Sequence, residues 1–425
     1  METLEIFLFD KRTILMLVIG VKIRTFAAEY IFMENNFKMV ATTMFGLEEV
    51  LAKELRDLGA QDVEVAVRSV SFKGDKGFMY KVNIALRTAI RILKPIRRFK
   101  VRGEEDLYKN LQKIEWEKYL DVDGTFAIGS VVNSSFFTTN SHYISLKSKD
   151  AIADYYRHKY SKRPNIDLKY PNLKIHIHIK DDLCTVSLDS SGDSLHKRGY
   201  RSSTNIAPIN EVLAAGLVLL SGYTGEENFI DPMCGSGTIL IEATMIACRI
   251  PANINRKHFA FESWLDYEED LYYLIQDSLL KHISTPHYKI MGFDKAPSAV
   301  QKAKENVENA NLADFVGIHH VNFFNSKKEV FGKTTIMFNP PYGERLELVD
   351  LEGFYKNIGD TLKFGYPGST AWFITSDMQA LKHVGLRTSK RIPMKNGDLD
   401  CRFVRYDMYE GSRKPEKTEW GTTEE

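Results

Sequence analysis

A short strand that ends in a glycine-rich turn and leads into an apolar helix constrains this 425-residue chain more than any other feature. The strand covers Asn228–Ile230, the turn reads Asp231-Pro232-Met233-Cys234-Gly235-Ser236-Gly237, and the helix covers Thr238–Ala247. Because glycine has no Cβ, the backbone N–H groups of Gly235 and Gly237 can approach a ligand closely. The helix N-terminus beside them adds a partial positive charge. The turn therefore predicts a small-cofactor site in an α/β domain.

The turn differs from two other glycine motifs. No Gly-Lys-Ser/Thr sequence follows, as it does in a P-loop, and the spacing is not G-x-G-x-x-G. Asp231 stands at the strand end, where it can position an amine or hydroxyl of a ligand. An ordinary strand-to-helix turn would also explain a lone glycine pair, so the cofactor interpretation depends on a second motif.

That motif is Asn339-Pro340-Pro341-Tyr342-Gly343, directly after the apolar run Thr335–Phe338. The prolines end the strand, and a residue before proline is held extended. Asn339 and Pro340 are therefore expected at the carboxyl edge of a sheet, where open α/β sheets bind ligands. The side-chain carbonyl of Asn339 and the main-chain carbonyl of Pro340 can accept hydrogen bonds from one exocyclic amine, and Tyr342 can stack on its ring.

Together the two segments resemble motifs I and IV of class I S-adenosylmethionine-dependent methyltransferases. More narrowly, the chain is similar to the THUMP-containing RNA guanine-N2 methyltransferases of the RlmL type, which act on bacterial large-subunit rRNA. The likeness extends from about Phe37 to about Glu410. Three further stretches carry it, namely Ser194–Arg201, Ile290–Asp294 and Gly397–Cys401.

The resemblance implies an α/β fold in which a Rossmann-like methyltransferase domain, with a doubly wound seven-stranded sheet, follows ferredoxin-like and THUMP modules. The alternation of strands and helices after Asn210 agrees with such a sheet. Met79–Leu93 is predicted to form a strand and then a helix. The expected domains are a ferredoxin-like module at 37–100, a THUMP RNA-binding domain at 101–195 and the methyltransferase domain at 196–410. Residues 1–36 are expected to be an extension, either a start-site artefact or disordered, and residues 411–425 a disordered tail.

The resemblance also assigns site residues around S-adenosylmethionine. Asp231, Gly235 and Gly237 would line its methionine part, with Cys234 in the same turn as a small packing residue rather than a nucleophile. Asp294 would hold the ribose hydroxyls and Asn322 the adenine. The stretch 251–288, which separates Asp294 from the glycine turn, is interpreted as an elaboration of the domain.

The implied catalytic residues are Asn339, Pro340 and Tyr342. Methyl transfer from a sulfonium is an in-line displacement that needs alignment more than acid–base groups. The carbonyl oxygens of Asn339 and Pro340 can localise the lone pair of a guanine N2 amine and favour the positive charge that builds on nitrogen. No strong base is required.

Charge and composition bear on the partner. The net charge is +1, and 44% hydrophobic with 27% charged residues is ordinary for a globular protein. Basic residues nevertheless gather in three clusters that predict phosphate contacts with RNA. The clusters are Arg87, Arg91, Lys94, Arg97, Arg98, Lys100 and Arg102; then Arg157, Lys159, Lys162 and Arg163; then Lys197, Arg198 and Arg201.

Several classes of site and location are disfavoured. The four cysteines have no C-x-x-C spacing, so no metal site is expected, and they suit a cytoplasmic protein. The apolar run Ile14–Ile19 is too short to cross a bilayer, which needs about 20 residues. No membrane association is expected, and the sequence leaves the oligomeric state open.

Three alternatives to an rRNA guanine-N2 methyltransferase remain at this stage. One is a tRNA guanine-N2 methyltransferase. Another is a DNA methyltransferase acting on adenine N6 or cytosine N4, since N-P-P-Y suits any amine on a planar ring. The last is a non-catalytic RNA-binding factor that kept the cofactor pocket. The THUMP-like elements favour RNA, and intact motifs favour catalysis.

Overall fold

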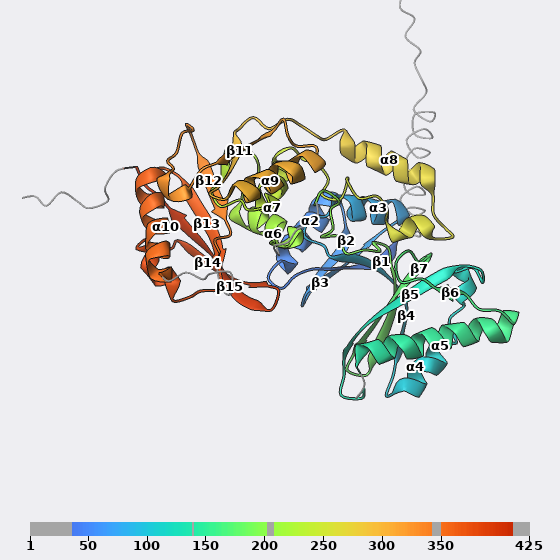
Figure 1. Ribbon diagram of the computed structural model, residues 1–425. Coiled ribbons are helices and arrows are strands. Elements are labelled where there is room, and N and C mark those ends of the chain that lie inside the picture. Colours follow the sequence, from blue (N-terminus) through green and yellow to red (C-terminus); the bar gives the residue numbers. More distant parts are fainter. Residues whose placement is uncertain (1–35, 138–139, 202–207, 342–349, 411–425) are drawn as a thin grey trace, which may run out of the picture.

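The computed structural model describes residues 36–137, 140–201, 208–341 and 350–410 (Figure 1). Nearly all of the expected N-terminal extension, the expected C-terminal tail and Tyr342 lie outside these ranges. Within them, two β-sheets organise the chain, an eight-stranded sheet in the N-terminal half and a seven-stranded sheet in the C-terminal half. The predicted α/β class is confirmed.

The N-terminal sheet is continuous across both predicted modules, because β4 pairs with β1 at its start and with β8 along most of its length. Its strands, in sheet order, are β2 Gln61–Ala66, β3 Ser69–Gly74, β1 Phe37–Thr42, β4 Arg91–Lys100, β8 Leu183–Asp189, β7 Leu173–Lys180, β5 Thr125–Asn133 and β6 Asn165–Ile166. Its helices are α2 Glu48–Leu58, α3 Lys76–Ala85, α4 Glu104–Leu111, α5 Ser141–Tyr160 and the short 3-10 helix η1 Trp116–Lys118.

The order predicted for Met79–Leu93 is wrong, since a helix precedes the strand there. Helix α3 begins after Asp75, whose side chain accepts a hydrogen bond from the Phe78 amide at 2.7 Å and caps the helix. The β-branched and aromatic residues that suggested a strand lie on the buried face of this helix, where packing outweighs their intrinsic preference.

The C-terminal sheet has the predicted doubly wound order. The strands, in sheet order, are β11 Val316–His320, β10 Ile290–Asp294, β9 Asn228–Asp231, β12 Thr334–Phe338, β13 Thr370–Thr375, β15 Leu399–Asp407 and β14 Lys390–Asn396. Strands β11 to β13 are parallel, and β15 is antiparallel to β13. The strand order reverses between β9 and β12, and open sheets bind ligands at such a switch point. The helices are α6 Glu211–Ser221, α7 Thr238–Ala247, α9 Pro297–Asn309 and α10 Leu351–Gly365, with short 3-10 helices η3 Phe323–Asn325 and η5 Ala380–Val384.

The stretch 251–288 joins the two halves. It contains η2 Ala260–Ser263 and α8 Glu269–Leu280, and α8 lies beside α3 of the N-terminal half (Figure 1). Phe261 stacks on Tyr80 with ring centroids 4.4 Å apart, and Lys76 forms an ion pair with Glu268 at 2.6 Å. The predicted elaboration of the methyltransferase domain therefore packs against α3 of the N-terminal half. We refer to residues 251–288 as the clamp.

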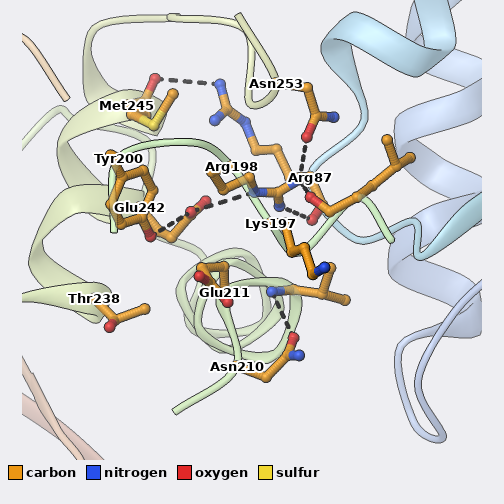
Figure 2. A network of polar contacts seen from close by, with 12 residues as sticks. Arg87, Lys197, Arg198, Tyr200, Asn210, Glu211, Thr238, Glu242, Met245 and Asn253 are labelled. Atoms are coloured by element: carbon orange, nitrogen blue, oxygen red, sulfur yellow. Dashed lines mark hydrogen bonds and ion pairs between the residues drawn. The ribbon is translucent and has the colours of Figure 1, made fainter. Parts of the chain in front are cut away.

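A buried polar network reinforces this junction (Figure 2). The guanidinium of Arg198, which is 1% exposed, donates to Glu242 at 3.5 Å, to Asn253 Oδ1 at 2.8 Å and to the carbonyl of Arg87. Arg87 in turn donates to main-chain carbonyls at the end of α7, those of Met245 and Ile250. Burial raises the pKa of the Glu242 carboxyl, and Arg198 opposes that rise.

These contacts correct part of the RNA-binding prediction, because Arg87 and Arg198 face the domain junction rather than a phosphate. Removing the cation of Arg198 would leave the buried Glu242 carboxylate with the Tyr200 hydroxyl at 3.2 Å as its remaining hydrogen-bond donor among the described residues, and breaking a buried ion pair typically costs about 3–5 kcal/mol.

We expect Arg198→Met to lower the free energy of unfolding by roughly 3–5 kcal/mol, as measured by chemical denaturation. The double variant Arg198→Met/Glu242→Met should lose less than the sum of the two single variants, since no charge is left unpaired. Additive losses would contradict a direct interaction between the two side chains.

Candidate functional site

The glycine turn folds back over the ends of β9 and β10. Gly235 and Gly237 have φ values of +54° and +81°, in the left-handed region that favours glycine. The Cys234 amide donates to the Phe293 carbonyl at 2.8 Å, and the Gly237 amide donates to the Cys234 carbonyl at 2.7 Å. A Cβ on Gly235 would point into open space, whereas one on Gly237 would lie 3.3 Å from Ala303 of α9. Gly235 thus presents backbone to a cavity, and Gly237 allows close helix packing.

Two carboxylates hold this turn. Asp231, which is 1% exposed, accepts a hydrogen bond from the Met233 amide at 3.2 Å. Asp294 accepts from the amides of Gly235 at 3.0 Å and Ala296 at 2.9 Å. Burial raises the pKa of Asp231 well above its ordinary value, and the nearby Asp294 charge raises it further. Burial also raises the pKa of the Cys234 thiol, which fits packing rather than nucleophilic chemistry.

The turn forms one wall of a cavity of about 210 Å³. The cavity brings Asp231, Cys234 and Gly235 together with Asn339 at the end of β12. The Oδ1 atom of Asn339 is buried and has no hydrogen-bond partner among the described residues. Such an atom is expensive to leave unpaired, so the cavity offers an acceptor that a ligand can satisfy. Two segments outside the described ranges, 202–207 and 342–349, adjoin the lining in sequence.

The remaining predicted residues are placed as follows. Pro340 is buried beside Asn339. Tyr342 lies outside the described residues. Asn322 is exposed at the end of β11 and does not line the cavity; its Oδ1 accepts from the Phe324 amide at 3.1 Å and caps η3.

Several cavity residues escaped the sequence analysis, because they carry no recognisable chemistry by themselves. They are Pro208 and Ile209 before α6, and Ala296, Ser298, Ala299 and Lys302 around α9. The sequence did hold one indication that Ala296 and Ser298 line the cavity, since both lie within four residues of Asp294 in the chain.

Arg201, predicted to contact phosphate, is instead part of the support of this site. Its guanidinium donates to Glu211 at 2.9 Å and to Thr238 Oγ1, at the start of α7, at 3.1 Å. Figure 2 places Glu211 and Thr238 on the methyltransferase side of the junction. The third basic cluster is therefore largely structural.

A larger hollow of about 910 Å³ lies on the other face of the sheet. Gly292 of β10 faces Leu240 of α7, so its neighbours Met291 and Phe293, which line this hollow, point away from α7. The hollow contains neither the glycine turn nor Asn339, and it is not the cofactor site.

The described ranges offer no metal-binding cluster and no membrane-spanning helix. Within them, no three His, Cys, Asp or Glu side chains are grouped so that they could hold a metal ion. None of the helices in those ranges has the length and apolar character needed to cross a membrane.

Three family models match successive parts of the chain. The family model described as the RMKL-like methyltransferase domain matches residues 198–405. The THUMP domain model matches 101–189, and the RlmL ferredoxin-like domain model matches 38–93. "Putative RNA methyltransferase slr0064" of Synechocystis sp. is 35% identical over 87% of this chain and 96% of its own length.

Ribosomal RNA large subunit methyltransferase K/L of Photobacterium profundum is 35% identical over 89% of this chain. The chain spans about half of that relative, 54% of its length. Among solved structures, SMU.472 complexed with SAH is similar with a TM-score of 0.80 and 30% identity, over 89% of this chain and all of that one. A "predicted N6-adenine-specific DNA methylase" from Listeria monocytogenes has a TM-score of 0.79 and 28% identity, over 89% and 98% of the two chains.

The raised pKa of Asp231 gives a pH-dependent stability. The unfolded carboxyl titrates near pH 4, whereas the folded one keeps its proton to higher pH because it is buried. The unliganded protein therefore loses stability as pH rises from about 4 through the folded pKa. A neutral amide at this position would lack this loss. The test compares the melting temperature of Asp231→Asn with that of the unsubstituted protein at pH 5 and at pH 8. We expect the difference, variant minus unsubstituted, to be about 2 °C or more larger at pH 8.

The exposed Asp270→Asn of α8 is the matched control, for which the difference should stay constant with pH. An equally constant difference for Asp231→Asn would show that the buried carboxyl is not perturbed.

Proposed function

The chain belongs to the RMKL-like family of S-adenosylmethionine-dependent RNA methyltransferases, and on that premise we propose that it methylates the exocyclic N2 amine of a guanine in large-subunit rRNA. Three considerations support this: the names of the K/L relatives, the THUMP match at residues 101–189, and the resemblance to guanine-N2 enzymes in the N-P-P-Y segment. The observation that carries it is the buried, unpartnered Oδ1 of Asn339 beside the glycine turn.

Asn339 and Pro340 provide the alignment that this reaction needs. The N2 amine of guanine is a weak nucleophile, since its lone pair is delocalised into the ring. Two carbonyl oxygens that accept its two N–H bonds hold the lone pair toward the cofactor and stabilise the charge that builds on nitrogen. An unpaired buried acceptor costs about 1–3 kcal/mol, and the amine removes that cost when it binds.

The residues of the turn fit the cofactor. When bound, S-adenosylmethionine supplies an electrophilic methyl carbon on its sulfonium. Gly235 lines the cavity without a Cβ, next to Asp231 and Cys234. Asp294 is proposed to hold the ribose hydroxyls: a carboxylate has about four acceptor sites, and the amides of Gly235 and Ala296 use two of them. Asn322 stays a proposed adenine contact, through its side-chain carbonyl oxygen, which also accepts from the Phe324 amide.

With S-adenosylmethionine bound, Asn339 and Pro340 would hold the N2 nitrogen in line with the methyl carbon, which would pass from sulfur to nitrogen, and the proton of the methylated amine would leave to water. Methyl transfer needs no general base at this site. We assign no proton-transfer role to Asp231 or Cys234. The cytoplasm, where rRNA is made in bacteria, is the proposed location.

One observation favours the alternative of a DNA methyltransferase, namely the name of the similar Listeria structure. The match of residues 101–189 to a THUMP model speaks for RNA over DNA. Choice between rRNA and tRNA rests on the K/L relatives alone.

We expect Asn339→Ala to lower the single-turnover rate of methyl transfer by at least about 100-fold, which is typical for loss of one transition-state hydrogen bond. Affinity for S-adenosylhomocysteine, measured by calorimetry, should stay nearly unchanged. Asn339→Asp keeps an acceptor oxygen and should retain more activity than the alanine variant. Equal loss of affinity and rate in Asn339→Ala would show that the residue is structural.

Methyl transfer from labelled cofactor to rRNA, tRNA and DNA separates the candidate substrates. We expect N2-methylguanosine, identified by mass spectrometry of the digested nucleosides, in large-subunit rRNA. Label in DNA alone, or in none of the three, would reject the proposed function.

A further inference from the structure

A second hollow, of about 220 Å³, lies where three segments distant in sequence meet. The loop before β7 and the start of that strand contribute Lys169 and Lys174, and the linker after β8 contributes Lys197. Arg256 and Lys257 come from the clamp 251–288. The single carboxylate in its lining is Asp193. We refer to this hollow as the cationic cleft.

The floor of the cationic cleft is closely packed against the clamp. Gly192 has a φ of +77°, and a Cβ there would lie 3.1 Å from the Cβ of Ala260. Gly199 has a φ of +98°, and a Cβ there would collide with the carbonyl of Asn255. The linker after β8 is thus packed closely against the clamp, so the cleft is preformed.

Arg256 adds its charge without a carboxylate partner at hydrogen-bond distance. Its guanidinium donates to main-chain carbonyls of the linker, those of Ser191, Asp193, Ser194 and Lys197. Its Nε is buried and has no hydrogen-bond partner among the described residues. Carbonyls orient the cation but do not neutralise it.

Of the four lysines, one has a carboxylate partner at ion-pair distance within the described ranges. Lys197 pairs with Asp193 at 3.3 Å. Lys174, half-buried, donates to the Gly192 carbonyl at 2.8 Å. Lys169 and Lys257 are exposed, and within the described ranges neither has a carboxylate within 4 Å. Lys169 and Lys257 therefore remain fully available to an anion, while the more buried Lys174 and Arg256 add positive charge behind them, partly offset by Asp189 and Asp193. The exposed ring of Tyr170, with the Lys169 ammonium 5.1 Å from its centroid, lies at the rim.

Of the basic clusters predicted from sequence, only Lys197 lines the cationic cleft. Arg157, Lys159 and Lys162 are each paired with a carboxylate. Arg198 and Arg201 point into the junction. Of the first cluster, Arg97, Arg98 and Lys100 are exposed on β4 and Arg102 just after it, and Lys100 pairs with Asp182 at 3.4 Å.

We propose that the cationic cleft binds backbone phosphates of the RNA substrate. Phosphates match its uncompensated charge, and its position at the seam between the THUMP region and the clamp places RNA contacts on both halves of the chain. The linker that forms its floor continues to Arg201, which reaches Thr238 at the cofactor turn. The proposal rests on the proposed function only in taking RNA as the substrate.

The test is the double variant Lys169→Gln/Lys257→Gln in the full chain, with protein-free large-subunit rRNA as probe. Both side chains are exposed and anchor no other segment, so the fold should be kept. Lys109→Gln/Lys281→Gln is the matched control, because it removes equal charge from exposed sites on α4 and after α8, outside the cleft.

The cleft variant should bind roughly 10-fold more weakly at about 0.1 M salt, and the slope of log affinity against log salt should fall by about 1.4–1.8, the value for two lost phosphate contacts. The control should show little change, and both variants should bind S-adenosylhomocysteine normally. Equal affinity and slope for cleft variant and control would overturn the proposal. A product other than N2-methylguanosine would reject the proposed function and leave this comparison intact.

Discussion

The site depends on the parallel pairing of β9 with β12. In this register Ile336 lies opposite Ile230, so both strands point their carboxyl ends to the same edge of the sheet. The glycine turn leaves β9 there, and Asn339 follows β12 there. An antiparallel pairing of the same residues would send the two motifs to opposite edges. The reversal of strand order at this pair leaves the space between the two loops open to a ligand.

The buried oxygen of Asn339 links this geometry to chemistry. In the network around Arg198, the carbonyls of Leu195 and Arg87 and the side-chain oxygen of Asn253 have a donor within the protein. Asn339 lies at the wall of a cavity with its acceptor unused. A polar group that folding leaves unsatisfied is destabilising, and in the proposed function this cost is removed when an amine binds.

Local sequence was sufficient to predict the doubly wound sheet, the glycine turn and the position of Asn339, because turn glycines, prolines and strand patterns act over a few residues. It was insufficient wherever the environment comes from distant segments. Arg87 and Arg198 looked like phosphate ligands until the fold enclosed them, and the stretch 251–288 gave no sign that Phe261 stacks on Tyr80. The cationic cleft is likewise formed by cations from three separate segments. The order of α3 and β4 was wrong for a related reason, since burial in the N-terminal core outweighed strand preference.

A crystal structure with S-adenosylhomocysteine and guanosine monophosphate tests the central claim most directly. The account predicts the sulfur beside the turn at Gly235 and the guanine N2 about 3 Å from both Asn339 Oδ1 and the Pro340 carbonyl oxygen. A complex in which Asn339 Oδ1 bonds to another protein group, or in which the base enters from the opposite face of the sheet, would contradict it.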